Sequence, residues 1–207
     1  KSDEFKANHS LSENSRLIDF LSNRYPIGKK NEKTDLSWLK ELTFIYDNHE
    51  VLSIPEALCF PNSQYSSEYS DDINYIHETV FGSLSDKSID WLSLLGTKEP
   101  SDVSIIETGK LFEEDFITED NAIDVLLYLF DLHSKSILEE SHYRSLRNIR
   151  LLTQKESFKT ASNCYLSDRY KPNLPIEKYV DVDFFVSTKY LDKKATASEL
   201  NVFLSMI

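Results

Sequence analysis

One short pattern occurs twice in this chain and limits the folds that it can adopt. Cys59 opens the sequence Cys-Phe-Pro-Asn-Ser-Gln-Tyr, and Cys164 opens the sequence Cys-Tyr-Leu-Ser-Asp-Arg-Tyr. In both, the cysteine precedes an aromatic residue and a tyrosine follows after four more residues, and the chain has no other cysteine. A pattern that recurs along a chain indicates a duplicated packing module, in which the shared residues are first of all structural.

The flanking segments agree in the same order. Aliphatic and aromatic positions in three segments of the first half match three segments of the second half, namely residues 18–21 with 123–126, 39–45 with 146–152, and 91–95 with 203–207. We therefore predict a first copy at residues 10–96, an acidic connector at 97–117 and a second copy at 118–207. Residues 1–9 are polar and are predicted to be disordered or a linker.

Local patterns predict the elements of each copy. In the first copy we expect a helix capped by Ser12 and stopped by Pro26, a loop at 28–35, a short helix at 36–42, a hairpin of 44–46 with 51–54, a mixed segment at 71–81 and a helix at 88–95 ended by Gly96. In the second copy we expect a helix at 122–132 capped by Thr118, a helix at 139–148, a hairpin of 150–153 with 157–159, a strand at 183–187 and a helix at 199–207. The first helix of the second copy is apolar almost all round and is predicted to be buried on several sides.

These elements predict the fold class. Each copy has the order helix, helix, β-hairpin, Cys loop and helix, which makes the chain an α+β protein that is predominantly helical. The two cysteines occupy equivalent places in separate copies, so we predict free, partly buried thiols and no disulfide.

Composition excludes several classes of function. Only Gly28, Gly82, Gly96 and Gly109 occur, none near another, which excludes glycine-rich phosphate loops. The formal net charge of −12 argues against a general nucleic-acid binder. No apolar run approaches the length of a membrane span and there is no signal peptide, so we expect a cytoplasmic protein. The chain lacks an initiator methionine and its apolar pattern runs to Ile207, so we expect it to be part of a longer protein.

Residues with catalytic potential do not form a recognisable motif. The five histidines lack the spacing of a zinc site, and no serine lies in a nucleophile elbow. Acidic pairs such as Asp181 with Asp183 are able to serve acid–base or metal chemistry, but in an acidic protein such pairs are mostly solvated surface or helix caps. A nuclease needs clustered acids together with a lysine, and no predicted strand presents Asp with Glu-x-Lys at that spacing. The sequence therefore predicts no catalytic, cofactor-binding or metal-binding residue, and leaves a divergent metal-dependent nuclease domain as the alternative.

Residues 142–171 reverse the acidic character of the chain. Aromatic residues are interleaved with the cations here, so the stretch is a candidate surface for binding a partner, with these candidate residues: Arg144, Arg147, Arg150, Lys155 and Lys159. The alternative is a solvated helix face, because Glu140 and Arg144 are spaced as an ion pair.

The second half resembles a known family. The resemblance is based on the segments Leu151–Lys155, Ala161–Tyr170 and Phe185–Leu191. In the first half, Trp91–Gly96 with Glu99-Pro100-Ser101 fits the same pattern. Together they resemble the repeat region of very large bacterial proteins related to sacsin and to the plant NO VEIN proteins. The resemblance implies an ATPase of the gyrase, heat-shock-chaperone and histidine-kinase type elsewhere in the parent protein, and it carries no catalytic residue onto this chain.

We therefore interpret the segment as a non-catalytic repeat or scaffold module from a large ATPase-containing protein. It would bind a protein partner, or other domains of the same parent, or couple the ATPase to an effector in a chaperone-like or defence-associated machine. Nucleic acid, a membrane and a cofactor are not expected as its partners.

Overall fold

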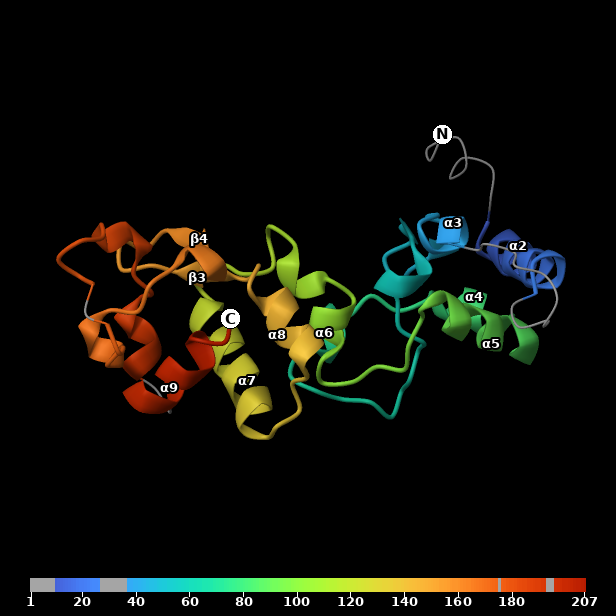
Figure 1. The fold of residues 1–207 in the computed structure, drawn as a ribbon. Coiled ribbons are helices and arrows are strands. Elements are labelled where there is room, and N and C mark those ends of the chain that lie inside the picture. The colour runs from blue at the N-terminus through green and yellow to red at the C-terminus, as the bar shows by residue number, and fades with distance from the viewer. Residues whose placement is uncertain (1–9, 27–36, 175, 193–195) are drawn as a thin grey trace. The chain divides into compact units, whose positions relative to one another are not determined.

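The structure is a computed structural model that describes residues 10–26, 37–174, 176–192 and 196–207 (Figure 1). The predicted linker at 1–9 and the predicted loop at 28–35 lie outside the described residues. The chain divides into two compact units, residues 1–108 (unit 1) and residues 109–207 (unit 2). Each unit is described by itself.

In the described residues of unit 1, 10–26 and 37–108, the α-helices are accompanied by one short hairpin. The helices are α2 (Leu11–Arg24), α3 (Ser37–Lys40), α4 (Glu78–Phe81), α5 (Asp86–Leu95) and α6 (Ser104–Glu107). The strands are β1 (Ile45–Tyr46) and β2 (Leu52–Ser53), and 3-10 turns occur at Pro55–Ala57 and Ser70–Asp72. The segment predicted as mixed at 71–81 is indeed part 3-10 turn, part extended chain and part helix.

The N-terminus of α2 lies two residues earlier than the sequence predicted. Ser10 is the N-cap residue, and the Glu13 carboxylate accepts a hydrogen bond from the Ser10 N–H at 2.7 Å. This Ser-x-x-Glu pattern forms a capping box, which satisfies backbone donors at the start of the helix. At the other end of the unit, α5 stops at Gly96 as predicted, because Gly96 adopts a φ of 119° that other residues rarely adopt.

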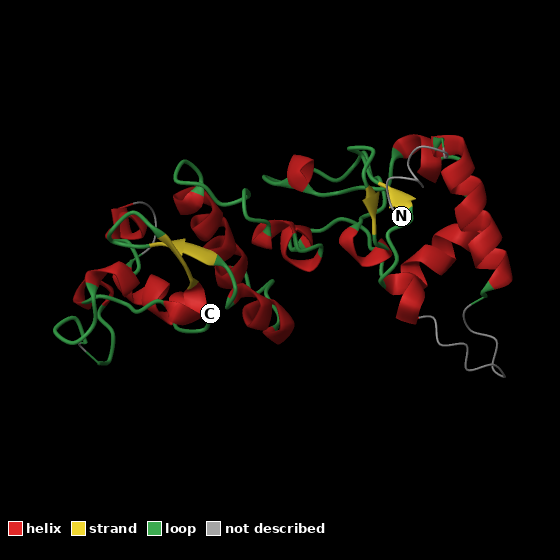
Figure 2. Cartoon of the chain, turned by 90° about the horizontal axis from the view of Figure 1, so that it is seen from above, coloured by secondary structure: helices red, strands yellow, loops and turns green. Residues whose placement is uncertain are grey.

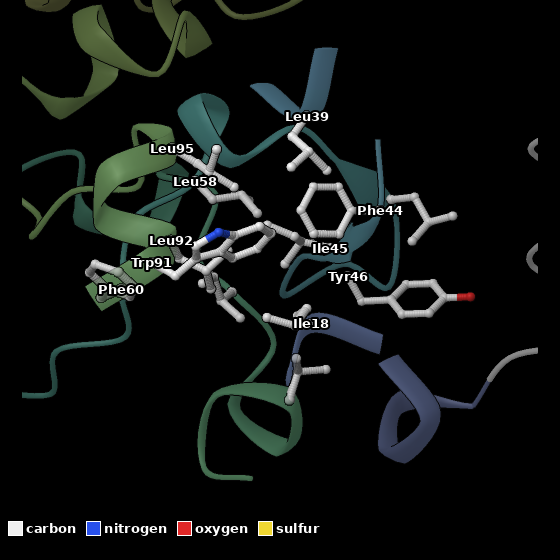
Figure 3. Close-up of a cluster of buried hydrophobic side chains, with 13 residues drawn as sticks. Ile18, Leu39, Phe44, Ile45, Tyr46, Leu58, Phe60, Trp91, Leu92 and Leu95 are labelled. Atoms are coloured by element: carbon white, nitrogen blue, oxygen red, sulfur yellow. The ribbon is translucent and has the colours of Figure 1, made fainter. Parts of the chain in front are cut away.

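A buried aromatic and aliphatic core holds unit 1 together (Figure 3). It joins α2, α3, the hairpin and α5 through the following fully or almost fully buried side chains: Ile18, Leu39, Phe44, Ile45, Tyr46, Leu58, Phe60, Trp91, Leu92 and Leu95. Polar groups inside it are paired. The Asn14 side-chain amide donates to the Phe44 carbonyl at 2.7 Å, and the Trp91 Nε1–H donates to the Tyr25 carbonyl at 2.9 Å. Buried polar groups need such partners, so these bonds also fix α2 against the hairpin and α5.

Short extended segments lengthen the hairpin of unit 1 into a ladder. β1 and β2 pair antiparallel, with Tyr46 opposite Leu52. Asp47 then bridges to Ile76 in the antiparallel sense, and Cys59 bridges in parallel both to Tyr75 and to Lys98. The order across this ladder is therefore β2, β1, residues 75–77, residues 58–60 and residues 97–98. Residues 97–108, which the sequence assigned to a connector, thus contribute a paired segment and α6 to unit 1.

The described residues of unit 2, 109–174, 176–192 and 196–207, form α-helices and the second hairpin. The helices are α7 (Ala122–Ser134), α8 (Glu140–Leu146) and α9 (Ala197–Leu204), and the strands are β3 (Arg150–Leu152) and β4 (Phe158–Thr160). The 3-10 turns are Lys110–Phe112, Ala161–Asn163, Asp168–Tyr170, Val182–Phe184 and Thr188–Asp192. The N-cap residue of α7 is Asn121 and not Thr118, whose N–H donates to the Asn121 side chain at 2.8 Å.

Helix α7 is fully buried along one stripe and partly buried at its other apolar positions. Its fully buried residues recur at helical spacing: Ala122, Val125, Leu126, Leu129 and Leu132. Other apolar residues of the helix, such as Leu127 and Tyr128, are only half-buried. Among the described residues, the exposed positions of this helix are Asp124, Asp131 and Ser134, so its full burial is confined to one stripe and its remaining apolar residues are partly covered.

The hairpin of unit 2 is also lengthened by extended segments. β3 and β4 pair antiparallel, with Leu152 opposite Phe158. Thr153 bridges to Val186 in the antiparallel sense, and Tyr165 bridges to Phe185 in parallel. The order is β4, β3, residues 185–187 and residues 164–166. Figure 2 shows the two strand pairs, one in each unit, among the helices that cover them.

The expected equivalence of the two cysteines is wrong by one residue. After the 3-10 turn of unit 1, the Leu58 N–H donates to the Pro55 carbonyl, and after that of unit 2 the Cys164 N–H donates to the Ala161 carbonyl. The next residue forms the parallel bridge, which is Cys59 in unit 1 and Tyr165 in unit 2. In these pairings Cys164 has the same hydrogen bond as Leu58, and Cys59 forms a parallel bridge as Tyr165 does.

The fold class agrees with the coarse prediction of a mixed α+β chain with two small two-stranded sheets. Among the described residues, no helix combines the length and the apolar content that a membrane crossing requires.

Candidate functional site

An open pocket of about 630 Å³ lies in unit 2 beside β4, and we call it the aromatic pocket. Its lining residues come from β3, β4, the 3-10 turn after β4, the extended residue Tyr165 and residues 179–184. They are Arg150, Phe158, Lys159, Thr160, Ser162, Asn163, Tyr165, Tyr179, Val180, Asp181 and Phe184. Four of these are aromatic, and three of the four are well exposed: Tyr179 at 85 %, Tyr165 at 46 % and Phe184 at 38 %. Exposed aromatic side chains gathered around one hollow are typical of a binding surface.

Two cations of the pocket stack on its aromatic rings. The guanidinium carbon of Arg150 lies 5.1 Å from the centroid of the Phe158 ring, and the Lys159 Nζ lies 4.4 Å from that of Phe184. Strand pairing positions both cations, because Arg150 and Lys159 lie on paired strands, where Arg150 is opposite Thr160 and Lys159 opposite Leu151. Cation–π contacts of this kind hold the rings and the charges in fixed places.

Carboxylates neutralise the lysines around the pocket. Lys159 forms an ion pair with Asp183 at 3.1 Å, and Lys155 forms one with Asp181 at 3.1 Å. A hydrogen bond from the Ser157 hydroxyl and the neighbouring lysine lower the pKa of Asp183, and the Asp183 N–H together with Lys155 lowers the pKa of Asp181. Both carboxylates are therefore ionised and each is held by a lysine, an arrangement that orients the loop of residues 181–184 against β4.

Arg150 differs from these lysines, because it has no carboxylate partner among the described residues. Its guanidinium donates to the backbone carbonyl of Glu114 at 2.5 Å and otherwise faces the Phe158 ring. It is half-buried and lines the aromatic pocket. The pocket therefore offers aromatic ring faces together with Arg150, whose guanidinium is able to bind an acidic group.

The structure brings together only part of the predicted basic surface. Arg150 and Lys159 line the aromatic pocket, and Lys155 reaches it through its ion pair with Asp181. Arg144 lies on α8, where it pairs with Glu140 at 2.5 Å, as the alternative interpretation of the sequence proposed. Arg147 follows α8 and is exposed, but it does not line the pocket.

Sequence reasoning missed Tyr179, Val180 and Phe184 as site residues. From the sequence, this stretch was considered only for its acidic pair, Asp181 with Asp183, and for a predicted strand at 183–187. A usable signal was present, because three apolar residues alternate with acidic ones within residues 179–184. The structure turns Phe184 and Tyr179 outward, and Phe185 inward, so the outward aromatic residues line the pocket.

The thiols are in their protonated form at neutral pH. Burial raises the pKa of Cys59, and it raises the pKa of Cys164 to about 11. The Cys164 Sγ donates to the Thr160 carbonyl at 3.5 Å, and the Cys59 Sγ donates to the Ser104 hydroxyl at 3.7 Å. Both cysteines are free, and their protonation makes them poor nucleophiles.

Histidines and acids show no cluster of metal ligands within the described part of the chain. His133 is 2.7 Å from the Tyr143 hydroxyl, and the His142 Nδ1 accepts from the Glu139 N–H at 3.0 Å, so the two histidines serve different contacts. Comparison with protein-family models, with curated proteins and with solved structures finds no match for this chain.

Proposed function

We propose that the chain is a non-catalytic scaffold region built from two copies of one packing module. The observation that carries this proposal is a common order of backbone hydrogen bonds. Backbone pairings among residues 45–60 of unit 1 recur among residues 151–166 of unit 2. Each matched residue of unit 2 lies 106 positions later in the chain than its counterpart in unit 1. The Asp47 N–H donates to the Val51 carbonyl at 2.9 Å, as the Thr153 N–H donates to the Ser157 carbonyl at 2.8 Å.

The returning segment follows the same order after a longer loop. In unit 1 the Ile76 N–H donates to the Cys59 carbonyl, and in unit 2 the Val186 N–H donates to the Tyr165 carbonyl. The order of buried and exposed positions from Ser88 to Leu95 in α5 is the same as that from Leu200 to Ile207, which covers the end of α9 and the three residues after it. A duplicated module in which backbone pairing and burial agree, and surface side chains differ, is typical of repeat scaffolds.

Differences at matched positions support a binding role for unit 2. The positions of Phe158, Lys159 and Tyr165 in the aromatic pocket are taken in unit 1 by Leu52, Ser53 and Cys59. The proposed frame is common to both units, whereas at these matched positions the aromatic and basic residues occur in unit 2. We infer that this surface binds a protein partner or another domain of the parent protein.

The resemblance to the repeat region of sacsin-like and NO VEIN-like bacterial proteins supports the same function. It implies an ATPase elsewhere in the parent, which this region would couple to an effector in a chaperone-like or defence-associated machine. The segment itself would need no cofactor.

Separate expression of the two units tests the proposal. If each is a module with its own core, residues 10–108 and residues 109–207 should each show helical circular dichroism and a cooperative thermal transition. A unit that folds only in the presence of the other would contradict the two-module account.

A nuclease assay tests the alternative. Single- and double-stranded DNA and RNA are incubated with the chain and with Mg²⁺ or Mn²⁺. The scaffold proposal predicts no cleavage above background. Metal-dependent cleavage that disappears in Asp181→Asn and in Asp183→Asn would replace the proposal with the nuclease function.

A further inference from the structure

A second pocket, of about 350 Å³, lies in unit 1 beside the turn of the first hairpin, and we call it the acidic hollow. Its walls include Asn48 of that turn, Tyr65, Asp71, Tyr75, and Glu78 at the start of α4. The Asn48 N–H donates to the Tyr75 carbonyl at 2.9 Å, and the Tyr75 N–H donates to the Asn48 side-chain oxygen at 3.0 Å. These two bonds fix the backbone on two sides of the hollow.

The hollow contains carboxylates and no basic side chain. Residues 41–86 supply all of its lining, and they contain no lysine and no arginine. Asp71 and Glu78 are both exposed, and within the part of the chain that the structure describes neither carboxylate makes an ion pair or a hydrogen bond. Two uncompensated carboxylates at one hollow create a negative potential that attracts a cation.

Two tyrosine rings are held in place as walls of the hollow. The Tyr75 hydroxyl donates to the Ser70 carbonyl at 3.1 Å, and the Tyr65 hydroxyl donates to the Ser67 hydroxyl at 2.9 Å. Burial, and to a smaller degree negative neighbours that include Asp71, raises the pKa of Tyr75 to about 12, so its ring is neutral at physiological pH. Neutral tyrosine rings attract cations through their faces.

Unit 2 has a pocket of about 400 Å³ at the corresponding place of its ladder. The Gln154 N–H donates to the Phe185 carbonyl at 2.9 Å, as the Asn48 N–H donates to the Tyr75 carbonyl. Three pairs of counterparts line the two pockets: Asn48 with Gln154, Ser63 with Arg169, and Glu78 with Thr188. The same hollow therefore accompanies both ladders.

In unit 2 the chain itself supplies cations to this place. Lys189 and Arg169 line the pocket, and the Lys189 Nζ forms an ion pair with the Glu156 carboxylate at 2.6 Å. The counterpart of Lys189 in unit 1 is Thr79, which follows Glu78 and carries no charge. One unit thus has its own cation at the hollow, whereas the other offers carboxylates without one.

We propose that the acidic hollow binds an arginine side chain of a partner polypeptide. The guanidinium pairs with the carboxylates of Asp71 and Glu78 and packs against a tyrosine ring. This inference rests on the proposed function, because it gives the scaffold a second partner-binding site, in unit 1. Arginine suits the hollow better than lysine, since its planar fork binds carboxylates in pairs and also stacks on aromatic rings.

A metal ion is a less suitable occupant than an organic cation. Hard metal ions such as Ca²⁺ take six or more oxygen ligands, most of them from carboxylates and carbonyls. Among the described residues, no three side chains of histidine, cysteine, aspartate or glutamate are grouped as metal ligands. Free polyamines share the charge of arginine, and the experiment separates them from a polypeptide.

The experiment uses the full chain labelled with ¹⁵N, titrated with the peptide acetyl-Gly-Arg-Gly-amide and followed by amide NMR shifts. We expect saturable shifts at the amides of Asn62, Tyr75 and Glu78, which all line the hollow. The same peptide with citrulline in place of arginine has nearly the same shape without the charge, and it should bind at least about tenfold more weakly. A lysine peptide should also bind more weakly, and equal binding of it would overturn the assignment to arginine.

Protein variants locate the site. Asp71→Asn combined with Glu78→Gln should weaken binding of the arginine peptide at least about tenfold. Asp72→Asn combined with Glu68→Gln is the matched control, because it removes the same charge from two exposed neighbours that do not line the hollow. The control should bind within about twofold of the parent, since exposed charges outside the contact are screened.

A cation supplied by the chain itself provides a second measurement. Thr79→Lys places a lysine at the position that Lys189 has in unit 2, and it should weaken binding of the arginine peptide at least about fivefold through charge repulsion and competition. Thr79→Met adds a side chain of similar length without charge and should change binding little. Circular dichroism and thermal midpoints check that each variant is folded.

Equal binding of the arginine and citrulline peptides, or equal binding to the parent and to the Asp71→Asn, Glu78→Gln variant, would overturn the site. Spermidine that binds the hollow more tightly than the arginine peptide would assign it to a free polyamine and overturn the polypeptide partner. Absence of binding, with both separate units folded, would remove the site and leave the proposed function standing. Failure of either unit to fold alone would contradict the proposed function whatever the peptide does.

Discussion

Glu50 and Glu156 adopt the same left-handed backbone conformation at the tips of the two hairpins, with φ of 56° and 58°. Each donates its N–H to the carbonyl three residues earlier, which belongs to Asp47 in unit 1 and to Thr153 in unit 2, at 3.0 Å in both. A positive φ is costly for glutamate, because its Cβ crowds the backbone. The two units therefore share even the strained residue of their turns.

This relationship predicts that glycine stabilises both turns. Glycine adopts a positive φ without steric cost, so Glu50→Gly and Glu156→Gly should each raise the free energy of unfolding by up to about 1 kcal/mol. Urea denaturation provides the measurement. Arg16→Gly, at an exposed position inside α2, should instead lower it by about 1 kcal/mol. Opposite signs at the two glutamates would contradict the common turn geometry.

A buried hydroxyl without a partner offers a second test. The Ser167 side chain is fully buried, and its Oγ has no hydrogen-bond partner within the described residues. Ser167→Ala removes this desolvated group and should leave the free energy of unfolding unchanged or raise it by about 1 kcal/mol. Ser88 is equally buried, but its Oγ lies 2.6 Å from an Asp19 carboxylate oxygen. Ser88→Ala should therefore lower the free energy of unfolding by about 1–3 kcal/mol, and a similar loss at Ser167 would mean that its hydroxyl has a partner in solution.

The buried stripe of α7 should dominate the stability of unit 2. Leu126 is 1 % exposed on this stripe, so Leu126→Ala removes buried methyl groups and leaves a cavity. We expect a loss of about 2–5 kcal/mol in the free energy of unfolding. Val202→Ala, at a position of α9 that is 58 % exposed, should change it by less than about 0.5 kcal/mol. An equally small effect at Leu126 would indicate that α7 is not the core helix.

The thiol of Cys164 should make stability fall at alkaline pH. Burial raises its pKa to about 11 from a value of 9.0, so between these values the unfolded chain binds fewer protons than the folded one. The free energy of unfolding therefore decreases as pH rises through this window, and it is unaffected by this group below about pH 9. Comparing Cys164→Ala with the parent chain isolates the contribution from that of other titrating groups. Alkylation by iodoacetamide should be slow at pH 7.5, and rapid alkylation of Cys164 there would contradict its protonated, half-buried state.

Local chemistry made some of the fold predictable. The four polar residues 47–50 between β1 and β2 predicted a hairpin, because a short polar turn between two β-rich runs is typical of that structure. Gly96 ended α5 as predicted, since only glycine readily adopts its φ of 119°. Helix starts were less certain in serine- and acid-rich stretches, where Ser10 and Ser12 are both able to cap and the position of Glu13 decides between them.

Backbone pairing across the ladder could not be predicted from residue types. The two cysteines are 105 residues apart, and this spacing was used to match the two halves of the sequence. The matching backbone hydrogen bonds instead follow the 3-10 turns at Pro55–Ala57 and Ala161–Asn163, which are 106 residues apart. Arg150 and Lys159 were found as candidates from composition. Their grouping with Tyr179 depends on the 179–184 loop folding back against β4, which no local pattern reports.

Amide hydrogen exchange measured by NMR on the folded chain tests the two-copy account most directly. The account predicts that matched amides are protected together, with Ile76 similar to Val186 and His77 similar to Ser187, since each pair donates to equivalent carbonyls. Protection of Ile76 and His77 with rapid exchange at Val186 and Ser187 would contradict the account, because unit 2 would then lack the ladder that defines the module.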